Sequence, residues 1–329
     1  MLQFEQPVRL VLFSLIGAAA IYSEMARAEV AGIGDDGWHT WQVDAVDGAP
    51  EMCCFSWRNG TANRKQCDLD GRHSGFNSSD QVSSSDTGIQ IYALLKAGAV
   101  TRIRAFSSSC PVATNSEVTD LGQVQTNDSV NWLSQHLGGN STSHAIAAIA
   151  VHDGPAALNT LLGAANPGND EAIREDAIFW MAQVRVAETA DDIKRYIFDD
   201  SNADTREHAA FAYSQSGATD IAATLIRQGR DDRNPDVRSQ AWFWLAQTEA
   251  AESEEAIRHA LLNDEDDDVR EEAVFALSQL PEERAVNALA AILEDRSLGM
   301  EIREQALFWL AQSDSDNAFE YIDRLLSDN

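Results

Sequence analysis

Histidines, cysteines and paired carboxylates are the side chains of this sequence that could bind a metal or catalyse a reaction. The histidines of the second half do not sit at the spacing that places two metal ligands on one helical turn; they are His144, His152, His208 and His259. Pairs of Asp and Glu are too frequent here to single out a general acid and base. The sequence has no phosphate-binding loop, dinucleotide fingerprint or Gly-x-Ser-x-Gly motif. We therefore expect no catalytic residue, no metal and no cofactor.

The cysteines favour disulfide bonds over a zinc site. All four lie in the first 140 residues, at Cys53, Cys54, Cys67 and Cys110. No Cys-x2-Cys pair is present, and His73 is the only histidine nearby. An even number of cysteines is typical of disulfides in an exported protein. Adjacent strand residues point to opposite faces, so we expect Cys53 and Cys54 each to bond one of the other two, in either combination.

Residues 1–28 have the organisation of a secretory signal peptide. Arg9 precedes an apolar segment that runs from Leu10 to Tyr22, and Ala26-Arg27-Ala28 provides an Ala-x-Ala cleavage site. A helix of this segment would rise about 20 Å, which is short for a bilayer. The alternative is an uncleaved anchor. We expect cleavage after Ala28 and a periplasmic or secreted mature chain without a membrane span.

The charge is strongly acidic and unevenly distributed. The chain has 53 Asp and Glu against 24 Lys and Arg, a formal net charge of -29. Residues 1–140 hold 9 basic and 15 acidic side chains, whereas residues 141–329 hold 15 and 38. A polyanion would be repelled by this surface, which argues against nucleic acid as a partner. The asymmetry predicts two units that meet near residue 140.

Residues 29–126 predict a small β-rich unit. Apolar and polar residues alternate around Trp41 to Ala45 and again around Ile89 to Leu95. Lys96 to Ala99 has the composition of a turn, which predicts a hairpin with the apolar residues that follow. Residues 127–140 are expected to form a connector helix. We therefore divide the chain into a signal peptide, a disulfide-stapled β-rich domain, a connector and a helical domain at 141–329.

The helical domain contains an internal repeat. A motif of an aliphatic residue, replaced by Thr205 in the second copy, then Arg, two variable residues and Ala recurs five times. Its arginines are 32, 32, 32 and 33 residues apart, at Arg174, Arg206, Arg238, Arg270 and Arg303. A second amphipathic pattern follows each copy, and acidic turns precede the next, where Asp236 and Asp268 are expected to cap the following helix. A degenerate sixth copy begins near Ser141. This pattern predicts stacked helix pairs, an α-solenoid of about six repeats.

Residues 141–329 closely resemble the short HEAT-like repeats, the type named after phycobilisome lyases. The resemblance implies a mainly α fold but no single function, because related arrays serve as scaffolds, inhibitors, lyases and hydroxylase domains. Deoxyhypusine hydroxylase, an iron enzyme built from such repeats, carries His-Glu pairs as metal ligands. This sequence has no His-Glu dipeptide.

Two kinds of side chain recur in register within the repeats. The arginines are expected to form a structural ladder, each bridging to an acidic turn of an adjacent repeat. One position is aromatic in every copy, at Phe179, Phe211, Phe243, Phe275 and Phe308, and the next position is aromatic in alternate copies, at Trp180, Trp244 and Trp309. Large and small residues that alternate predict core-filling tryptophans. For the phenylalanines two interpretations stay open, burial between helices or an exposed partner groove or self-association seam.

These features together predict an exported, non-enzymatic scaffold or adaptor. Acidic turns would steer a basic or polar protein or peptide partner, and the aromatic positions would anchor it. One alternative is an enzyme of the repeat superfamily, either lyase-like or metal-dependent. Another is a cell-envelope structural protein that self-assembles through the phenylalanines.

Overall fold

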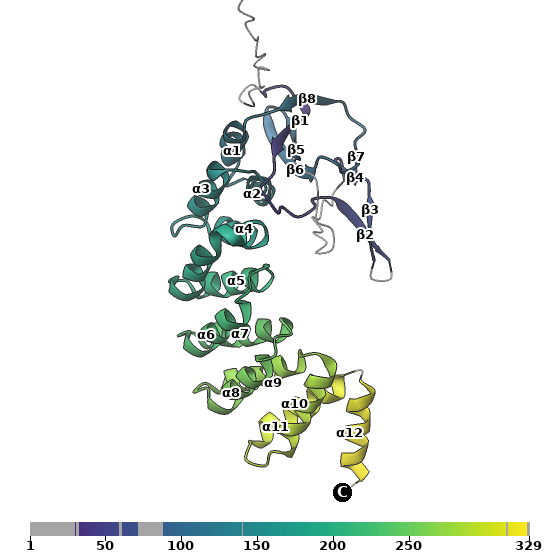
Figure 1. Cartoon of the computed structure of the whole chain (residues 1–329), viewed down its shortest axis with the longest axis vertical. Coiled ribbons are helices and arrows are strands. Elements are labelled where there is room, and N and C mark those ends of the chain that lie inside the picture. The colour runs from purple at the N-terminus through teal and green to yellow at the C-terminus, as the bar shows by residue number, and fades with distance from the viewer. Residues whose placement is uncertain are drawn as a thin grey trace, which may run out of the picture.

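The computed structural model joins a small sheet region to a curved array of helix pairs (Figure 1). It describes residues 30, 33–58, 61–71, 88–139, 141–313 and 315–327. The predicted signal peptide and its cleavage site lie outside the described residues. In the part of the chain that is described, no helix is long and apolar enough to cross a membrane.

Four strands form the main sheet, in the order β6-β5-β1-β8. Their bounds are Gly37–Asp44 for β1, Gly88–Lys96 for β5, Ala99–Ser107 for β6 and Val118–Gln123 for β8. β5 pairs antiparallel with both β1 and β6, and β8 pairs parallel with β1. The β5–β6 turn has two left-handed residues, Ala97 and Gly98, whose N–H groups donate to the carboxylate of Asp36 at 2.8 and 3.0 Å. The predicted hairpin is confirmed.

Both predicted disulfides form beside this sheet. Cys53 bonds Cys110 and Cys54 bonds Cys67, with Cα–Cα distances of 5.5 and 5.3 Å. They join two short ladders, in which β2 pairs with β3 and β4 with β7; the bounds are Cys54–Arg58, Thr61–Lys65, Cys67–Asp68 and Val112–Ala113. The cysteines form a separate apolar cluster with neighbours that include Trp38 and Phe106. The disulfides therefore attach peripheral strands to the sheet.

A buried hydrogen-bond chain fastens the sheet to the first helices. Trp41 Nε1 of β1 donates to Ser129 Oγ of α1 (Thr126–Ser134) at 2.7 Å. Ser129 Oγ lies 2.7 Å from Nε2 of His152, just beyond α2 (Thr142–Ala150), and His152 Nδ1 lies 2.6 Å from the carbonyl of Ala148. These distances fit a neutral His152 that accepts from Ser129 and donates to Ala148. Sheet and helices share one continuous apolar core here.

We expect this junction to weaken in acid. Burial lowers the pKa of His152 from 6.5 to about 4, with Arg185 nearby acting in the same direction and the Ala148 hydrogen bond opposing. The unfolded chain thus takes up the proton first, so stability is complete above pH 6.5 and falls as pH drops towards 4, by on the order of 3 kcal/mol. Urea unfolding of the wild type and of His152→Gln across this window should give the flatter pH profile for the variant. Parallel profiles would contradict the assignment.

Six helix pairs make up the solenoid among the described residues, which confirms the predicted repeat array. After α2 the helices are α3 (Pro155–Ala164), α4 (Glu171–Asp199), α5 (Ala203–Ser214), α6 (Ile221–Asp231), α7 (Pro235–Gln247), α8 (Ser253–Asn263), α9 (Asp267–Ser278), α10 (Glu282–Glu294), α11 (Met300–Gln312) and α12 (Asp316–Ser327). α4 is itself a pair, because the backbone of Arg185 leaves helical geometry and kinks it.

The helix starts differ from the sequence prediction in one detail. Asn234 and Asp266 cap α7 and α9, and each side chain accepts hydrogen bonds from the backbone of the first turn. The predicted caps Asp236 and Asp268 lie two residues further on, inside that first turn. Acidic residues are favourable there as well, because they face the positive end of the helix dipole.

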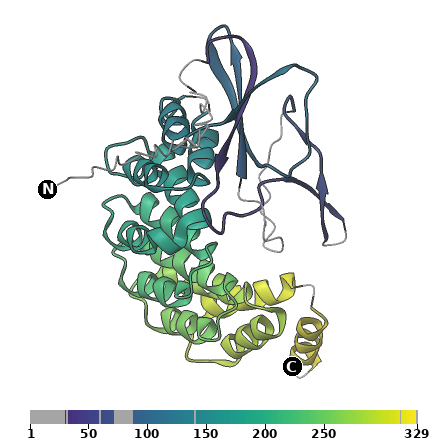
Figure 2. The same ribbon diagram turned by 45° about the horizontal axis from the view of Figure 1, so that its top comes forward.

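The helices form two rows along a curved path (Figures 1 and 2). In the first row α4, α5, α7, α9 and α11 pack each on the next. α6, α8, α10 and α12 form the second row, in which neighbouring helices make fewer contacts. The repeat motifs, with their arginines and aromatic residues, therefore all lie in the closely packed first row.

A close contact between Gly229 of α6 and Trp242 of α7 gives a test of the packing. A Cβ on Gly229 would lie 2.5 Å from Cε2 of the Trp242 ring, which is itself only 1% exposed. We expect Gly229→Ala to destabilise the protein by about 1–3 kcal/mol through overpacking. The matched control is Gly163→Ala on α3, where a Cβ meets nothing within 4 Å. It should be neutral or stabilising by up to about 1 kcal/mol. Equal urea midpoints for both variants would contradict the packing.

Candidate functional site

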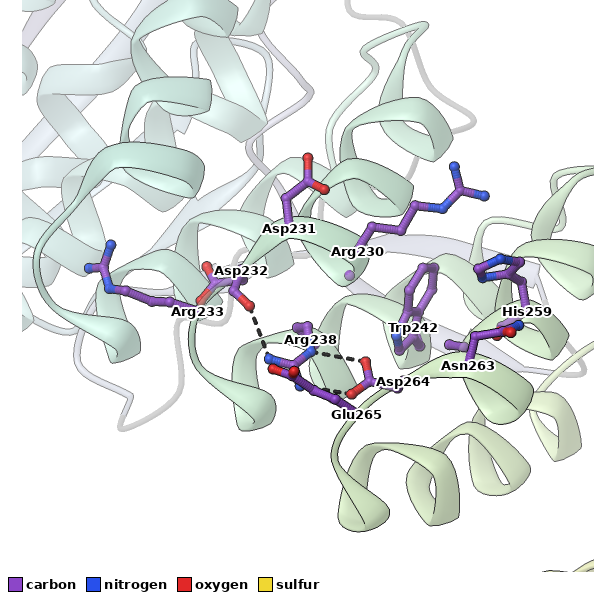
Figure 3. Close-up of a pocket in the computed structure, with 12 residues that line it drawn as sticks. Arg230, Asp231, Asp232, Arg233, Arg238, Trp242, His259, Asn263, Asp264 and Glu265 are labelled. Atoms are coloured by element: carbon purple, nitrogen blue, oxygen red, sulfur yellow. Dashed lines mark hydrogen bonds and ion pairs between the residues drawn. The ribbon is translucent and has the colours of Figure 1, made fainter.

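The recurring arginines lie in the joints between repeats. Three of them bind an aspartate 26 residues further on, in the pairs Arg174–Asp200, Arg206–Asp232 and Arg238–Asp264. Figure 3 shows Arg238 with Nε and Nη2 on Asp264, at 3.0 and 2.8 Å, and Nη1 on the carbonyl of Asp232 at 3.0 Å. Such bidentate pairs fix geometry.

The other two arginines depart from this pattern. Arg270 keeps the hydrogen bond to the joint, with Nη1 2.7 Å from the carbonyl of Asp264, but its ion pair is with Asp267 in its own helix. Arg303 donates to the carbonyl of Leu293. Asp232 stays ionised in its pair with Arg206. Burial raises its pKa, but hydrogen bonds from Arg206 and from the Asn234 backbone outweigh this and hold the pKa below its ordinary value. The three paired arginines are engaged within the array rather than free for a ligand.

The recurring aromatic residues form one connected surface, which we call the aromatic ladder. Its members are Phe179, Trp180, Phe211, Phe243, Trp244, Phe275, Phe308 and Trp309. Phe179 stacks on Phe211 at a centroid distance of 6.1 Å, and Phe243 on Phe275 at 5.7 Å. The phenylalanines whose own copy lacks a Trp, Phe211 and Phe275, contact Trp244 and Trp309 of the following copy, at 4.8 and 4.7 Å.

The rings of the ladder are neither buried nor fully exposed. The tryptophans and Phe179 pack against the core with part of each ring accessible. The other phenylalanines, apart from the last, are also only partly exposed. Phe308, in the last copy, is 54% exposed. Four of the five phenylalanines therefore lie between the two predicted arrangements, partly buried against rings of neighbouring helices, and only Phe308 is exposed. The ladder is a partly accessible apolar strip that runs across α4, α5, α7, α9 and α11.

An acidic groove of about 640 Å³ lies over the middle of the ladder. α5, α7 and α9, stacked in Figure 1, contribute its lining: Glu207, Pro235, Asp236, Ser239, Gln240, Phe243, Asp268, Glu271, Glu272 and Phe275. Five of these residues are carboxylates and none is a cation. In the described part of the chain none of the five carboxylates forms an ion pair, although Glu271 accepts a hydrogen bond from Gln305 at 2.8 Å.

The electrostatics of the groove are those of an uncompensated negative site. The pKa of Glu207 is raised, first by burial and then by the like charges of Asp204 and Asp236. Neighbouring carboxylates therefore repel one another, and a cation placed among them would be attracted. Phe243 and Phe275 offer ring faces, whose negative quadrupole also attracts cations.

A second hollow, of about 540 Å³, lies beside Trp242 between α6, α7 and α8 (Figure 3). Both signs of charge line it, with Arg230 and Arg233 among the cations and Asp231 and Glu265 among the carboxylates. The indole N–H of Trp242 is buried and finds no hydrogen-bond partner among the described residues. Because the lining carries both arginines and carboxylates, it favours neither an anionic nor a cationic ligand. We assign this hollow no function.

The histidines are scattered rather than gathered. His152 is buried in the junction, His208 Nε2 lies 3.0 Å from the carbonyl of Glu175, and His259 lines the hollow around Trp242. Across the described ranges, no group of three or more His, Cys, Asp or Glu side chains is arranged to hold a metal ion.

The comparison with known protein families agrees with the repeat fold. Residues 222–311 match the family model for HEAT repeats, so this segment is a HEAT-like repeat array. A search of curated proteins returned no match. Among solved structures, the Escherichia coli protein YibA is 20% identical, with 60% of this chain and 81% of that chain covered and a TM-score of 0.36. Human deoxyhypusine hydroxylase, in complex with glycerol, is 17% identical, with 60% and 77% covered and a TM-score of 0.26.

The carboxylates of the groove are not among the predicted site residues, although Asp236 and Asp268 were expected as helix caps. Acidic pairs are frequent throughout the chain, but their position relative to the repeat arginine is a distinguishing signal. An acid stands two residues before it in four copies, at Asp204, Asp236, Asp268 and Glu301, and one residue after it in four copies, at Glu175, Glu207, Glu271 and Glu304. This fixed offset places the acids on the helices that carry the ladder.

Proposed function

We propose that the protein is an exported, non-enzymatic scaffold that binds a protein or peptide partner along the aromatic ladder. The observation that carries this proposal is the ladder itself, eight partly accessible aromatic rings in contact across five helices. Contiguous apolar surface of this kind marks interaction sites, and aromatic side chains dominate their energetics. The acidic groove gives the surface its preference for basic or polar partners.

Export rests on the signal-peptide pattern together with the disulfides. Two disulfides use all four cysteines, and such bonds persist in oxidising compartments. Fractionation of cells that express the full chain should place it outside the cytoplasm, with its first residue at Glu29. Recovery of an unprocessed, reduced chain from the cytoplasm would contradict export.

Affinity capture from the extracytoplasmic fraction tests the scaffold. The bait is the full chain with its disulfides. The sheet and the first helices share one apolar core, so deletion of the repeats would expose that core. We expect a partner that the wild type retains and Phe243→Leu/Phe275→Leu loses, since leucine keeps the apolar character but removes the ring faces. The matched control is Leu262→Ala on α8, an exposed apolar residue away from the ladder. A partner retained by the ladder variant would move the function to another surface.

Self-association is a second candidate, favoured by the exposed apolar residues of α11. Met300, Leu307 and Phe308 are 72%, 42% and 54% exposed. Sedimentation over a range of concentrations should show dimers that Phe308→Ser abolishes. A monomer at every concentration would exclude this candidate.

A further inference from the structure

We propose that the acidic groove recognises an extended peptide with an arginine or lysine at every third residue, each cation lying over the ladder between carboxylates of neighbouring repeats. This inference rests on the proposed function, because it names the partner of the same surface. It goes further by specifying the chemistry and the sequence register of that partner.

Charge complementarity identifies a basic occupant. The groove between α5, α7 and α9 has five carboxylates, two phenylalanine rings and no cation in its lining. A neutral apolar segment could cover Phe243 and Phe275, but it would bury carboxylates without compensation, which is costly. A guanidinium or ammonium group suits both the carboxylates and the phenylalanine rings of the groove, because it forms ion pairs with carboxylates and is attracted to aromatic rings.

The contrast with the repeat arginines shows why the cation must come from outside. Asp200, Asp232 and Asp264, at the joints, each have an arginine of this chain. The groove carboxylates have no such partner within the described ranges, and Glu207 is half-buried beside Asp204 and Asp236. An approaching cation would relieve this repulsion, as the arginines do at the joints.

The register follows from the repeat. Each first-row helix brings a Phe and at least one carboxylate at the same positions of the motif, so the surface has a period of one helix spacing. Packed helices lie about 8–10 Å apart. A chain in the polyproline II conformation advances about 3.1 Å per residue and makes one turn in three residues, so three residues span one repeat and return the side chain to the same face. A segment that crosses α5, α7, α9 and α11 would place its basic residues at positions one, four, seven and ten.

Arginine should bind better than lysine at these positions. Its planar guanidinium stacks on aromatic faces and can engage two carboxylate oxygens at once, whereas the lysine ammonium is a strongly hydrated point charge. Phe243 and Phe275, near-parallel to each other at an interplanar angle of 11°, both line the groove, so a planar guanidinium can contact the accessible part of each ring.

Fluorescence anisotropy with synthetic peptides provides the test. The probe contains four Arg-Ser-Ala units, and its isomer has the same composition with the four arginines contiguous. At physiological ionic strength we expect the full chain to bind the spaced peptide about tenfold more tightly than the isomer, and the lysine version to be weaker. Equal affinity for the two isomers would overturn the register.

Two charge-matched variants separate recognition from general attraction. Glu207→Gln/Glu272→Gln neutralises two groove carboxylates and should weaken binding of the spaced peptide about tenfold. The control Glu282→Gln/Glu283→Gln removes the same charge from exposed positions on α10 and should change affinity less than about twofold. An equal loss in both variants would overturn the groove as the site.

The outcomes distinguish this inference from the proposed function. If no basic peptide binds, while the captured partner still depends on Phe243 and Phe275, the scaffold function stands and the basic occupant is wrong. If the spaced peptide binds and the groove variant weakens it, the inference is supported even when the native fraction yields no partner.

Discussion

Replacement of Cys53 and Cys110 by serine should lower the free energy of unfolding by about 4 kcal/mol. The two cysteines are separated by 57 residues, and a cross-link over such a length removes much of the conformational entropy of the unfolded chain. The loss is large for a protein whose total stability is about 5–15 kcal/mol. We therefore expect the double variant to unfold at a clearly lower urea concentration than the wild type.

The second disulfide provides the internal comparison. Cys54 and Cys67 are only 13 residues apart, so their replacement by serine should cost less, about 3 kcal/mol. Addition of a reductant to the wild type should lower its midpoint at least as far as the Cys53/Cys110 variant. A wild type whose midpoint is unchanged by complete reduction, verified by thiol titration, would contradict a stabilising role for both bonds.

The repeats could be predicted because the same pattern of buried and joint residues occurs in five copies. Each copy must bury Ala and aliphatic residues on one helix face, place Arg at the joint and begin again after a turn, so the period is visible without structure. The disulfide alternatives were also limited by local geometry, since Cys53 and Cys54 point to opposite faces. Only contacts across the chain, such as that between Cys53 and Cys110, could select one of the two pairings.

The junction and the groove could not be predicted in this way. The junction depends on three residues that are far apart in sequence, Trp41, Ser129 and His152. Nothing in the local sequence around each of them distinguishes it from an ordinary core or surface residue. The exposure of the phenylalanines depends on how closely first-row helices stack, which the motif does not determine. The sequence leaves the exposure of the phenylalanines undetermined. From sequence alone, the acidic residues beside them therefore cannot be distinguished from surface charge that only increases solubility.

The largest effect of a single substitution is expected at Arg206. Its guanidinium is 1% exposed and binds Asp232 through two bonds, Nε–Oδ2 at 2.7 Å and Nη2–Oδ1 at 2.8 Å, while Nη1 donates to the carbonyl of Asp200 at 3.0 Å. Arg206→Met would keep much of the apolar volume but leave a buried carboxylate, 4% exposed, without its cation. Breaking a buried pair in this way costs about 3–5 kcal/mol.

Two further variants test whether the pair itself is responsible. Arg270→Met alters the equivalent arginine of a later repeat, whose side chain is 33% exposed, pairs with a largely exposed Asp267 and donates to the carbonyl of Asp264. Because no buried carboxylate loses its cation, the expected loss is only about 1–2 kcal/mol. Arg206→Met/Asp232→Leu removes both charges and should recover most of the loss, because no unpaired buried charge remains. If urea unfolding shows equal losses for Arg206→Met and Arg270→Met, or no recovery in the double variant, the inter-repeat ion pair is not what makes Arg206 essential. The joint between α5 and α7 would then depend on packing alone.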